Sequence, residues 1–423
     1  MEVAVPTPIR AWVMGIGAFT QGLLRCLRED GAEVAAYLTR DYGHWGPRQE
    51  GRTWSIDEVA NPCDLVRRER PNLIVPMSIE WALRSWTEEF LALGPALLCP
   101  TGEGLRLERE RDYARRLCEE AGIPFARAVR VGSRGEAEVL VRREQRPYVI
   151  KNPLCSPTSP IHTVVCDTWE DTLAWLGRMD DSEGIFLQEN LGRREAGHIA
   201  LVSDGEIHSL VTNQEYKRAF DGNLGMVAGA PLGGLVERDP EDRHGLARQL
   251  LHPLLPWFRE VKYRGPVQVT AILHDDRWHV IEYNVRLGVT CGPLIGRMLA
   301  NPVETFWRCA KGFGLAPRWR PEARFGCSLT LAGYGYPFTQ LAGPRVPVVT
   351  EGAPTCDVWW QEVAGREDGG LEATGHRLAD VAAVAGTLGE AIDCVYENIR
   401  RIRSMGSYYR TDIGRSLWPP GHP

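Results

Sequence analysis

The chain lacks the features that would assign it to a membrane, to secretion or to nucleic acid. No segment reaches the ~18 consecutive apolar residues that a membrane helix needs. The first residues, MEVAVPTPIRAW, lack the basic start and the cleavage site of a signal peptide. The formal net charge of −6 gives no reason to expect a nucleic-acid partner. We therefore expect a cytoplasmic protein with no membrane segment.

Paired cysteine motifs are also missing. The eleven cysteines are odd in number and scattered, and no two of them form a CxxC pair. This spacing gives little support to a zinc knuckle or a redox-active motif. We expect free thiols in a reducing compartment.

What is present is typical of a soluble protein of several domains. The 423 residues exceed the size at which one core usually divides, and 43% of them are hydrophobic and 25% charged. Strands at 9–17, 33–39 and 72–78 alternate with helices at 19–30 and 80–93. This alternation predicts a parallel α/β domain over residues 1–105.

The middle of the chain has a different pattern, which predicts an α+β domain over 106–315. It opens with a charged run at 106–122, which we expect to be a solvated helical linker. Asp204-Gly205 is a turn dipeptide and predicts a hairpin. The other expected elements are strands at 147–153, 185–191, 266–273 and 278–285 and helices at 167–179 and 240–258.

The last part predicts a small β-rich domain over 316–423. It follows a helical bridge at 290–313, includes a strand at 327–335, and closes with a helix at 387–405.

The clearest chemical motif is IEYNVR at 281–286. Side chains alternate along a strand, so Glu282, Asn284 and Arg286 point to the same face. A carboxylate beside an amide oxygen suits Mg²⁺, and an arginine can stabilise a phosphoryl group in transfer. The alternative is an exposed polar face beside a turn at Leu287-Gly288.

Three further groups precede this motif. Lys151 is a lone lysine in an apolar strand, where an ATP phosphate is a natural partner, although an edge strand also favours lysine. Glu189 and Glu195 follow a strand, and Lys217-Arg218 precede a glycine-containing turn that could clamp phosphates. Taken singly, Lys151 is better explained as an edge-strand lysine. Glu189 and Glu195 could belong to a charged loop, and Lys217-Arg218 are equally well explained as a basic surface loop.

The order of the four groups, together with longer segments, resembles the glycinamide ribonucleotide synthetase (phosphoribosylamine–glycine ligase) family of ATP-grasp enzymes. NQEYKRAFDGNLGMVAGAP is similar to the family's DHKR…DGD segment, IEYNVRLG to LEFNCRFG, and SLTLAGYGYP to a strand that ends in a GYP turn. The closing segment at 374–414 resembles the family's GGRVL…YR.DIG signature. The resemblance covers nearly the whole length and implies an ATP-grasp fold, with a lid at about 125–190.

The resemblance also implies residue roles. Lys151, Lys217 and Arg218 would meet ATP phosphates, and Glu189 and Glu195 would face adenine and ribose. Glu282 and Asn284 would bind Mg²⁺, with Mn²⁺ as an alternative. Lys217 and Arg286 would be catalytic, and Arg286 would also contact the substrate carboxylate. Residues expected to bind substrate are Gly15, Gly17, Glu80, Asp221 and Arg286.

Four segments depart from the family pattern. The family's GSGGREHAL loop reads Gly15 to Gly22 here, with Phe19, Thr20 and Gln21 in place of Arg, Glu and His. The family's GPEAPL segment corresponds to PMSIEWAL in this chain, and only Glu80 is matched there. The family's glycine-rich ATP loop corresponds to LCSPTSPIHTV at 154–164 of this chain. The family's FGDPE segment corresponds to LGVTC, with Cys291 at the last position.

Because three of these changes fall on the substrate side, we expect an ADP-forming carboxylate–amine ligase that uses an acyl phosphate and has a changed substrate. Its partners would be a small-molecule carboxylate, such as an amino acid, and an amine. The first alternative is glycinamide ribonucleotide synthetase itself. The second is a nucleotide-binding protein that does not catalyse ligation. The sequence does not indicate an oligomeric state.

Overall fold

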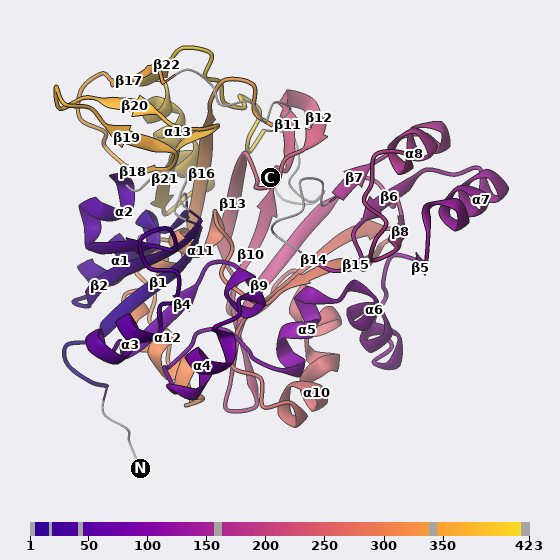
Figure 1. Ribbon diagram of the computed structural model, residues 1–423, viewed down its shortest axis with the longest axis horizontal. Coiled ribbons are helices and arrows are strands. Elements are labelled where there is room, and N and C mark those ends of the chain that lie inside the picture. The colour runs from indigo at the N-terminus through magenta and orange to yellow at the C-terminus, as the bar shows by residue number, and fades with distance from the viewer. Residues whose placement is uncertain (1–4, 17–18, 41–44, 156–162, 338–344, 416–423) are drawn as a thin grey trace.

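The computed structural model describes residues 5–16, 19–40, 45–155, 163–337 and 345–415. Figure 1 shows a long central sheet with a parallel α/β layer on one side and a separate lobe on the other. All eleven cysteines lie in the described part and are free thiols, as the sequence predicts. Among the described helices, none combines the length and the apolar character needed to cross a membrane.

The first sheet is parallel, with the strand order β3-β2-β1-β4. Residues 11–15 of its central strand are buried, because helices cover both faces of such a sheet. This arrangement confirms the predicted parallel α/β layer. Its elements are β1 (Arg10–Ile16), α1 (Gln21–Glu29), β2 (Glu33–Arg40), α2 (Trp45–Glu50), β3 (Arg52–Ser55), α3 (Cys63–Glu69) and β4 (Leu73–Pro76).

The helix predicted at 80–93 is broken. A 3₁₀ turn, η2 (Glu80–Leu83), is followed by an extended residue, Arg84, and then by α4 (Thr87–Ala92). The Thr87 hydroxyl lies 2.8 Å from the carbonyl of Trp81 and 2.7 Å from that of Arg84. A side-chain hydroxyl that binds these carbonyls competes with the helical ladder, and this explains the break.

The charged run at 106–122 is not a solvated linker, and the prediction is wrong on this point. It forms two helices, α5 (Glu103–Arg109) and α6 (Arg111–Glu120), with an extended Glu110 between them. The break lets the backbone pair with a neighbouring segment, since Arg111 N–H donates to Pro153 O and Cys155 N–H donates to Arg109 O. Leu107 and Glu108 are buried by this packing.

The separate lobe is an antiparallel sheet with the order β5-β8-β6-β7, covered by two helices. A small apolar core of its own holds the sheet and the helices together. In Figure 1 this lobe projects from the rest of the molecule, where the sequence predicts a lid. Its elements are β5 (Ala128–Val131), α7 (Arg134–Glu144), β6 (Tyr148–Lys151), β7 (Thr163–Val165), α8 (Trp169–Leu176) and β8 (Ile185–Glu189).

The central sheet is antiparallel throughout, with the order β15-β14-β9-β10-β13-β16-β21-β18. The predicted turn at Asp204-Gly205 joins β9 to β10, and both residues have positive φ, as a tight hairpin requires. The sheet includes strands that follow residue 316 in the chain. The domain boundary that the sequence places at 315–316 therefore stays a prediction. Its strands are β9 (Glu195–Ser203), β10 (Glu206–Glu215), β13 (Gly233–Arg238), β14 (Gly265–His274), β15 (Arg277–Asn284), β16 (Phe325–Ala332), β18 (Asp357–Trp360) and β21 (Arg377–Ala385).

The single long helix predicted at 240–258 is wrong. The segment contains α9 (Leu246–Leu250), the 3₁₀ turn η4 (His252–Leu254) and α10 (Leu255–Glu260). Pro253 and Pro256 carry no backbone N–H and start new turns, because proline cannot continue a helical ladder. The bridge predicted at 290–313 is confirmed as α11 (Cys291–Met298) and α12 (Pro302–Lys311).

The C-terminal part adds α13 (Leu388–Ile399), which packs against β16 and β21, and a four-stranded sheet with the order β19-β20-β17-β22. Thr387 and Glu390 form a capping box at the start of α13. The helix ends six residues before the predicted position 405, because 402–404 pair as a strand. The remaining strands are β11 (Arg218–Phe220), β12 (Leu224–Val227), β17 (Pro347–Thr350), β19 (Val363–Gly365), β20 (Leu371–Ala373) and β22 (Ile402–Ser404).

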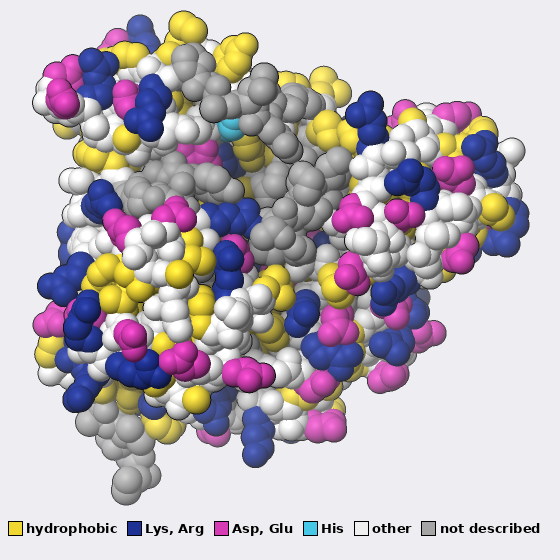
Figure 2. Space-filling model, viewed as in Figure 1, with side chains coloured by type: hydrophobic (Ala, Val, Ile, Leu, Met, Phe, Trp, Pro, Cys, Tyr) yellow, Lys and Arg dark blue, Asp and Glu magenta, His cyan; other side chains and the backbone are white. Residues whose placement is uncertain are grey.

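The surface seen in Figure 2 carries acidic and basic side chains that are interspersed over the projecting lobe and the lower half of the molecule. Many charged side chains of the protein are paired, for example Arg67 with Glu89 and Arg115 with Glu119. Exposed pairs of this kind contribute little to stability, typically ~0–1 kcal/mol each. Their mixture of signs is ordinary for a protein surface.

Candidate functional site

The motif at 281–286 has the geometry that its spacing predicts. Tyr283 and Val285 are buried in the core, while Glu282, Asn284 and Arg286 lie on the opposite face of the strand end. The guanidinium of Arg286 donates from Nη2 to Oδ1 of Asn284 at 3.0 Å. A carboxylate and an amide oxygen therefore stand on one face, next to a fixed arginine.

Lys217 joins this motif to two other strands. Its ammonium lies 2.9 Å from Oε1 of Glu282, 2.8 Å from Oε1 of Glu195 and 3.7 Å from Oε2 of Glu215. Burial alone would lower the pKa of Lys217, but the three carboxylates outweigh burial and raise it well above its usual range. Lys217 is therefore charged, and it neutralises acidic groups from β9, β10 and β15.

Glu282 is ionised in this environment. Burial alone would raise the pKa of Glu282, but Lys217, Lys151 and Arg111 outweigh burial and hold that pKa far below its usual range. A carboxylate that stays charged at neutral pH is suited to bind a divalent cation. Its environment thus supports the role that the sequence predicts for it.

Lys151 is not an edge-strand lysine. It ends β6, which lies between β8 and β7, and its side chain is buried. Its ammonium donates to the carbonyl of Ile281 at 3.0 Å. The β14–β15 pairing shifts register at this point, so that Ile281 is the extra residue of a bulge and its carbonyl is free to accept. Burial lowers the pKa of Lys151 to about 7, and the charge of Arg111 acts in the same direction.

Three residues of this cluster, Glu215, Arg111 and Glu108, are absent from the sequence-based candidates, and the last two come from the N-terminal side of the chain. Arg111 places Nη1 3.9 Å from Oε2 of Glu282 and donates from Nε to the carbonyl of Asn152 at 2.9 Å. Glu108 lies 3.3 Å from Nε of Arg286. Both belong to the charged run at 106–122, whose apolar positions at 114, 117, 118 and 121 mark a helix face but do not show which of its many charged residues are buried.

Glu189 and Arg218 are engaged by groups outside the cluster around Glu282. Glu189 ends β8 and forms an ion pair with Arg146 at 3.1 Å. Arg218 donates to the carbonyl of Gly225 at 2.9 Å and lies 3.9 Å from Asp167. Their roles at the nucleotide stay predictions.

The residues expected on the substrate side are dispersed. Glu80 is buried and engaged by Arg40 at 3.1 Å and by Arg84, so that its carboxylate stabilises the N-terminal layer. Asp221 accepts the backbone N–H of Thr411 at 2.8 Å and also binds the Thr411 hydroxyl. These contacts show structural roles for both carboxylates, while substrate contact stays a prediction.

The first glycines are only partly described. Gly15 allows a close backbone approach, since a Cβ there would lie 3.1 Å from Cβ of Met77. Gly17 lies outside the described residues, as do residues 156–162 of the altered ATP loop.

Two of the residues that replace family positions lie near charged groups. The ring of Phe19 lies 5.4 Å from the guanidinium of Arg377, which is the first residue of β21, is buried and also contacts the ring of Tyr336. Cys291 begins α11, with its sulfur 3.5 Å from Nδ2 of Asn213 and 4.0 Å from Oε1 of Glu215. The substituted positions thus border the charged centre on one side and the C-terminal sheet on the other.

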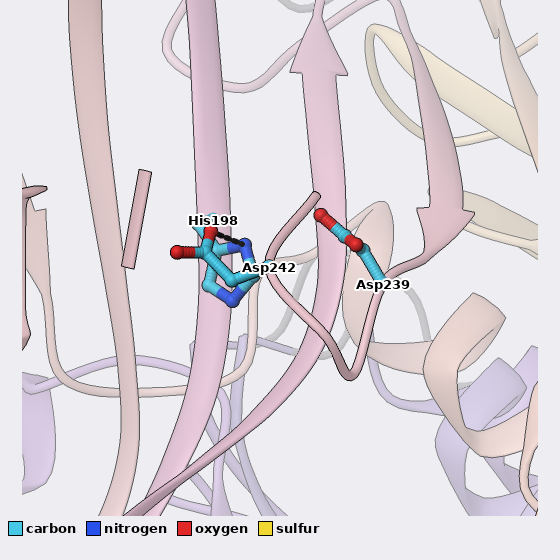
Figure 3. A group of neighbouring side chains, drawn as sticks. All are labelled: His198, Asp239 and Asp242. Atoms are coloured by element: carbon cyan, nitrogen blue, oxygen red, sulfur yellow. Dashed lines mark ion pairs between the residues drawn. The ribbon is translucent and has the colours of Figure 1, made fainter. Parts of the chain in front are cut away.

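A second cluster of ligand-type side chains, His198, Asp239 and Asp242, lies on the other side of β9 (Figure 3). Nδ1 of His198 is 3.1 Å from the Thr212 hydroxyl, which donates to Asp239 at 2.8 Å. Asp242 caps α9, since its oxygens accept backbone N–H groups at 2.9 and 2.7 Å. These hydrogen bonds account for both carboxylates, so we interpret the cluster as structural.

Family models match most of the described site. The model described as "Phosphoribosylglycinamide synthetase, ATP-grasp (A) domain" matches residues 109–290. The model described as "Phosphoribosylglycinamide synthetase, C domain" matches residues 326–416. The first match includes the cluster around Glu282 except Glu108, and the second includes Arg377.

Curated relatives agree with these matches. The phosphoribosylamine–glycine ligase of Leifsonia xyli is 31% identical over 330 residues, covering 74% of this chain and 77% of that protein. The phosphoribosylamine–glycine ligase of Thermotoga maritima is 26% identical over 428 residues, covering 96% of this chain and 99% of that protein.

Solved structures show the same fold. The crystal structure of the Thermotoga maritima phosphoribosylamine–glycine ligase has a TM-score of 0.77 at 22% identity and covers 96% of this chain and 100% of that one. The biotin carboxylase domain of the Hydrogenobacter thermophilus 2-oxoglutarate carboxylase, in complex with MgADP, has a TM-score of 0.69 at 14% identity, covering 95% and 91%. The chain therefore belongs to the phosphoribosylglycinamide synthetase family of ATP-grasp carbon–nitrogen ligases.

Proposed function

We propose that this ligase joins glycine to phosphoribosylamine at the expense of ATP, which it converts to ADP and phosphate. The observation that carries the proposal is the cluster around Glu282, where the cations of Lys151, Arg111 and Lys217 surround one ionised carboxylate. The relatives that carry the name phosphoribosylamine–glycine ligase support this substrate pair. They favour the first alternative drawn from the sequence over the changed-substrate interpretation.

The charged groups fit a nucleotide and its metal ion. Glu282 and Asn284 offer adjacent oxygen ligands, which Mg²⁺ prefers, and Mn²⁺ is accepted by similar ligands. The bound ion supplies positive charge against the phosphates. Lys151 and Arg111 are the cations positioned to hold those phosphates, since both side chains are largely buried and face Glu282.

The proposed reaction has two balanced steps. A carboxylate oxygen of glycine attacks the γ-phosphorus of ATP, the bond to the β-phosphate oxygen breaks, and ADP leaves with the electron pair. The amine of phosphoribosylamine then attacks the acyl carbon, phosphate leaves, and the amine loses a proton to give the amide. Arg286 and Lys217 compensate the negative charge that moves between these groups, and neither forms a covalent bond.

A second substrate candidate, another small carboxylate or amine, rests on the residues that replace family positions. Phe19 lies over Arg377, and Cys291 lies beside Glu215, where the family pattern has polar or acidic residues. A site that lacks such partners would bind a less polar substrate. The non-catalytic alternative has less support, because the chain belongs to a family of ligases and keeps the charged cluster.

Product analysis distinguishes these proposals. The purified protein is incubated with ATP, Mg²⁺, glycine and freshly prepared phosphoribosylamine, and parallel reactions contain pooled amino acids and amines. We expect ADP, phosphate and glycinamide ribonucleotide, identified by mass spectrometry. An amide formed only in a pool would establish the changed substrate. AMP with pyrophosphate, or no nucleotide cleavage in any reaction, would contradict the proposed chemistry.

A further inference from the structure

Glu108 is a buried carboxylate that takes no part in the proposed chemistry, although it lies directly behind the metal-ligating face of β15. It is only 5% exposed. Its Oε2 accepts the backbone N–H of Val285 at 2.7 Å, and its Oε1 lies 3.3 Å from Nε of Arg286. A buried carboxylate that accepts one backbone N–H and forms an ion pair with the next residue is a specific contact, since an unpaired charge at this depth would be costly.

The hydrogen bond from the Val285 N–H to Glu108 lies just beyond the last residue of β15 that pairs with β14. The last residue of β15 that pairs with β14 is Asn284, opposite Gln268. The next N–H, that of Val285, needs an acceptor because it is buried, and Glu108 supplies one. The Cys99 thiol lies 3.7 Å from the Val285 carbonyl on the other side of the peptide. α5 and its neighbouring segment therefore fix the end of β15.

The ion pair of Glu108 with Arg286 also affects the amide of Asn284, because Arg286 contacts both side chains. The guanidinium is planar and rigid, so a carboxylate close to Nε restricts the orientation of its other nitrogens as well. One of these, Nη2, donates to Oδ1 of Asn284 at 3.0 Å. A chain of three side chains thus runs from α5 to a ligand that we assign to the metal ion.

We propose that Glu108 is a positioning residue, which acts through Arg286 to fix the amide of Asn284 and with it the ligand pair that holds the metal–nucleotide complex. This role rests on the proposed function of Asn284. Supporting groups behind metal ligands typically change metal affinity by ~10- to 100-fold when they are replaced. Glu108 would therefore control affinity for the metal–nucleotide complex without touching it.

The variant Glu108→Gln separates the two contacts of Glu108. The amide oxygen of Gln still accepts the Val285 N–H, while its charge and its ion pair with Arg286 are lost. We expect binding of Mn²⁺–ADP, measured by electron paramagnetic resonance, to weaken by ~10- to 100-fold. The control is Glu110→Gln, two residues away, whose carboxylate pairs with Arg106 at 2.9 Å and should leave binding unchanged.

A double-variant comparison tests whether Glu108 acts through Arg286. Arg286→Met should weaken Mn²⁺–ADP binding at least as much as Glu108→Gln, and the combination should add little to Arg286→Met alone. If Glu108→Gln does not fold, Glu108→Asp provides the same comparison, because the shorter carboxylate keeps its charge but cannot reach both donors.

The outcomes are distinguishable. Unchanged Mn²⁺–ADP affinity in the Glu108 variant, with wild-type protein that binds the complex, would overturn the positioning role alone. Additive losses in the double variant would show that Glu108 does not act through Arg286 and would also overturn it. A wild-type protein that binds no Mn²⁺–ADP would contradict the proposed function itself.

Discussion

At the scale of single residues, the sequence pattern identifies Lys151 as a candidate site residue but does not reveal its surroundings in the fold. Its position as a lone cation on an apolar strand identifies it as a candidate. The sequence does not distinguish an interior strand from an edge strand, because that depends on which strands pair. The structure places β6 between two neighbours and Lys151 against the bulge carbonyl of Ile281, where its burial lowers its pKa to about 7.

Lys151 should take up a proton when nucleotide binds. With a pKa of about 7, its amine is largely neutral at pH 8, and nearby phosphates favour the charged form. We expect uptake of up to ~1 proton on ADP binding at pH 8, measured by titration calorimetry in two buffers of different ionisation enthalpy. Lys151→Arg keeps its charge at all pH values and should abolish the uptake. Binding without proton uptake in the wild-type protein would contradict this assignment.

A second prediction at the scale of residues concerns Glu282. Replacing Glu282 by Gln removes the charge of a metal ligand and should lower turnover by ~100-fold or more, while the thermal transition stays near that of the wild type. Steady-state ADP release measures turnover, and circular dichroism follows unfolding. Glu206→Gln, an exposed change on β10, is the matched control. Near-normal turnover in Glu282→Gln would refute the metal assignment.

At the scale of elements, periodicity predicts the strands and most helices and fails where local side chains or prolines intervene. The break in the helix at 80–93 depends on the Thr87 hydroxyl, and the break at 240–258 depends on two prolines. The prolines are visible in the sequence and could have corrected the second prediction. The break at Glu110 could not be predicted, because it depends on backbone pairing with residues 153–155.

The buried His198 of β9 should make the protein sensitive to acid. Burial lowers the pKa of His198 to about 4, below the ~6.5 of an unfolded histidine. The native state therefore resists protonation, so the stability that neutral His198 provides is complete above pH ~6.5 and is lost as the pH falls towards 4. We expect the unfolding midpoint in urea to fall between pH 7 and pH 4.5. His198→Asn keeps a donor for Thr212 and should show a smaller fall, and an equal fall would contradict the prediction.

At the scale of the whole molecule, the resemblance predicts the fold, and the structure brings the predicted Lys217, Glu195 and Glu282 together, while their contact with ATP stays a prediction. The cluster itself is assembled from α5, α6, β6, β9, β10 and β15, which are distant in sequence. Glu108 and Val285 are 177 residues apart, and only the folded chain reveals their contact. The substrate roles expected for Glu80 and Asp221 stay predictions, and in the structure both carboxylates bind the protein's own groups.

The fate of the carboxylate oxygen tests acyl-phosphate formation most directly. Glycine labelled with ¹⁸O in its carboxylate is turned over with phosphoribosylamine, ATP and Mg²⁺, and the inorganic phosphate is examined by mass spectrometry. Phosphoryl transfer to the carboxylate predicts that each phosphate released carries one ¹⁸O atom. Phosphate without label, or label found in AMP, would contradict it.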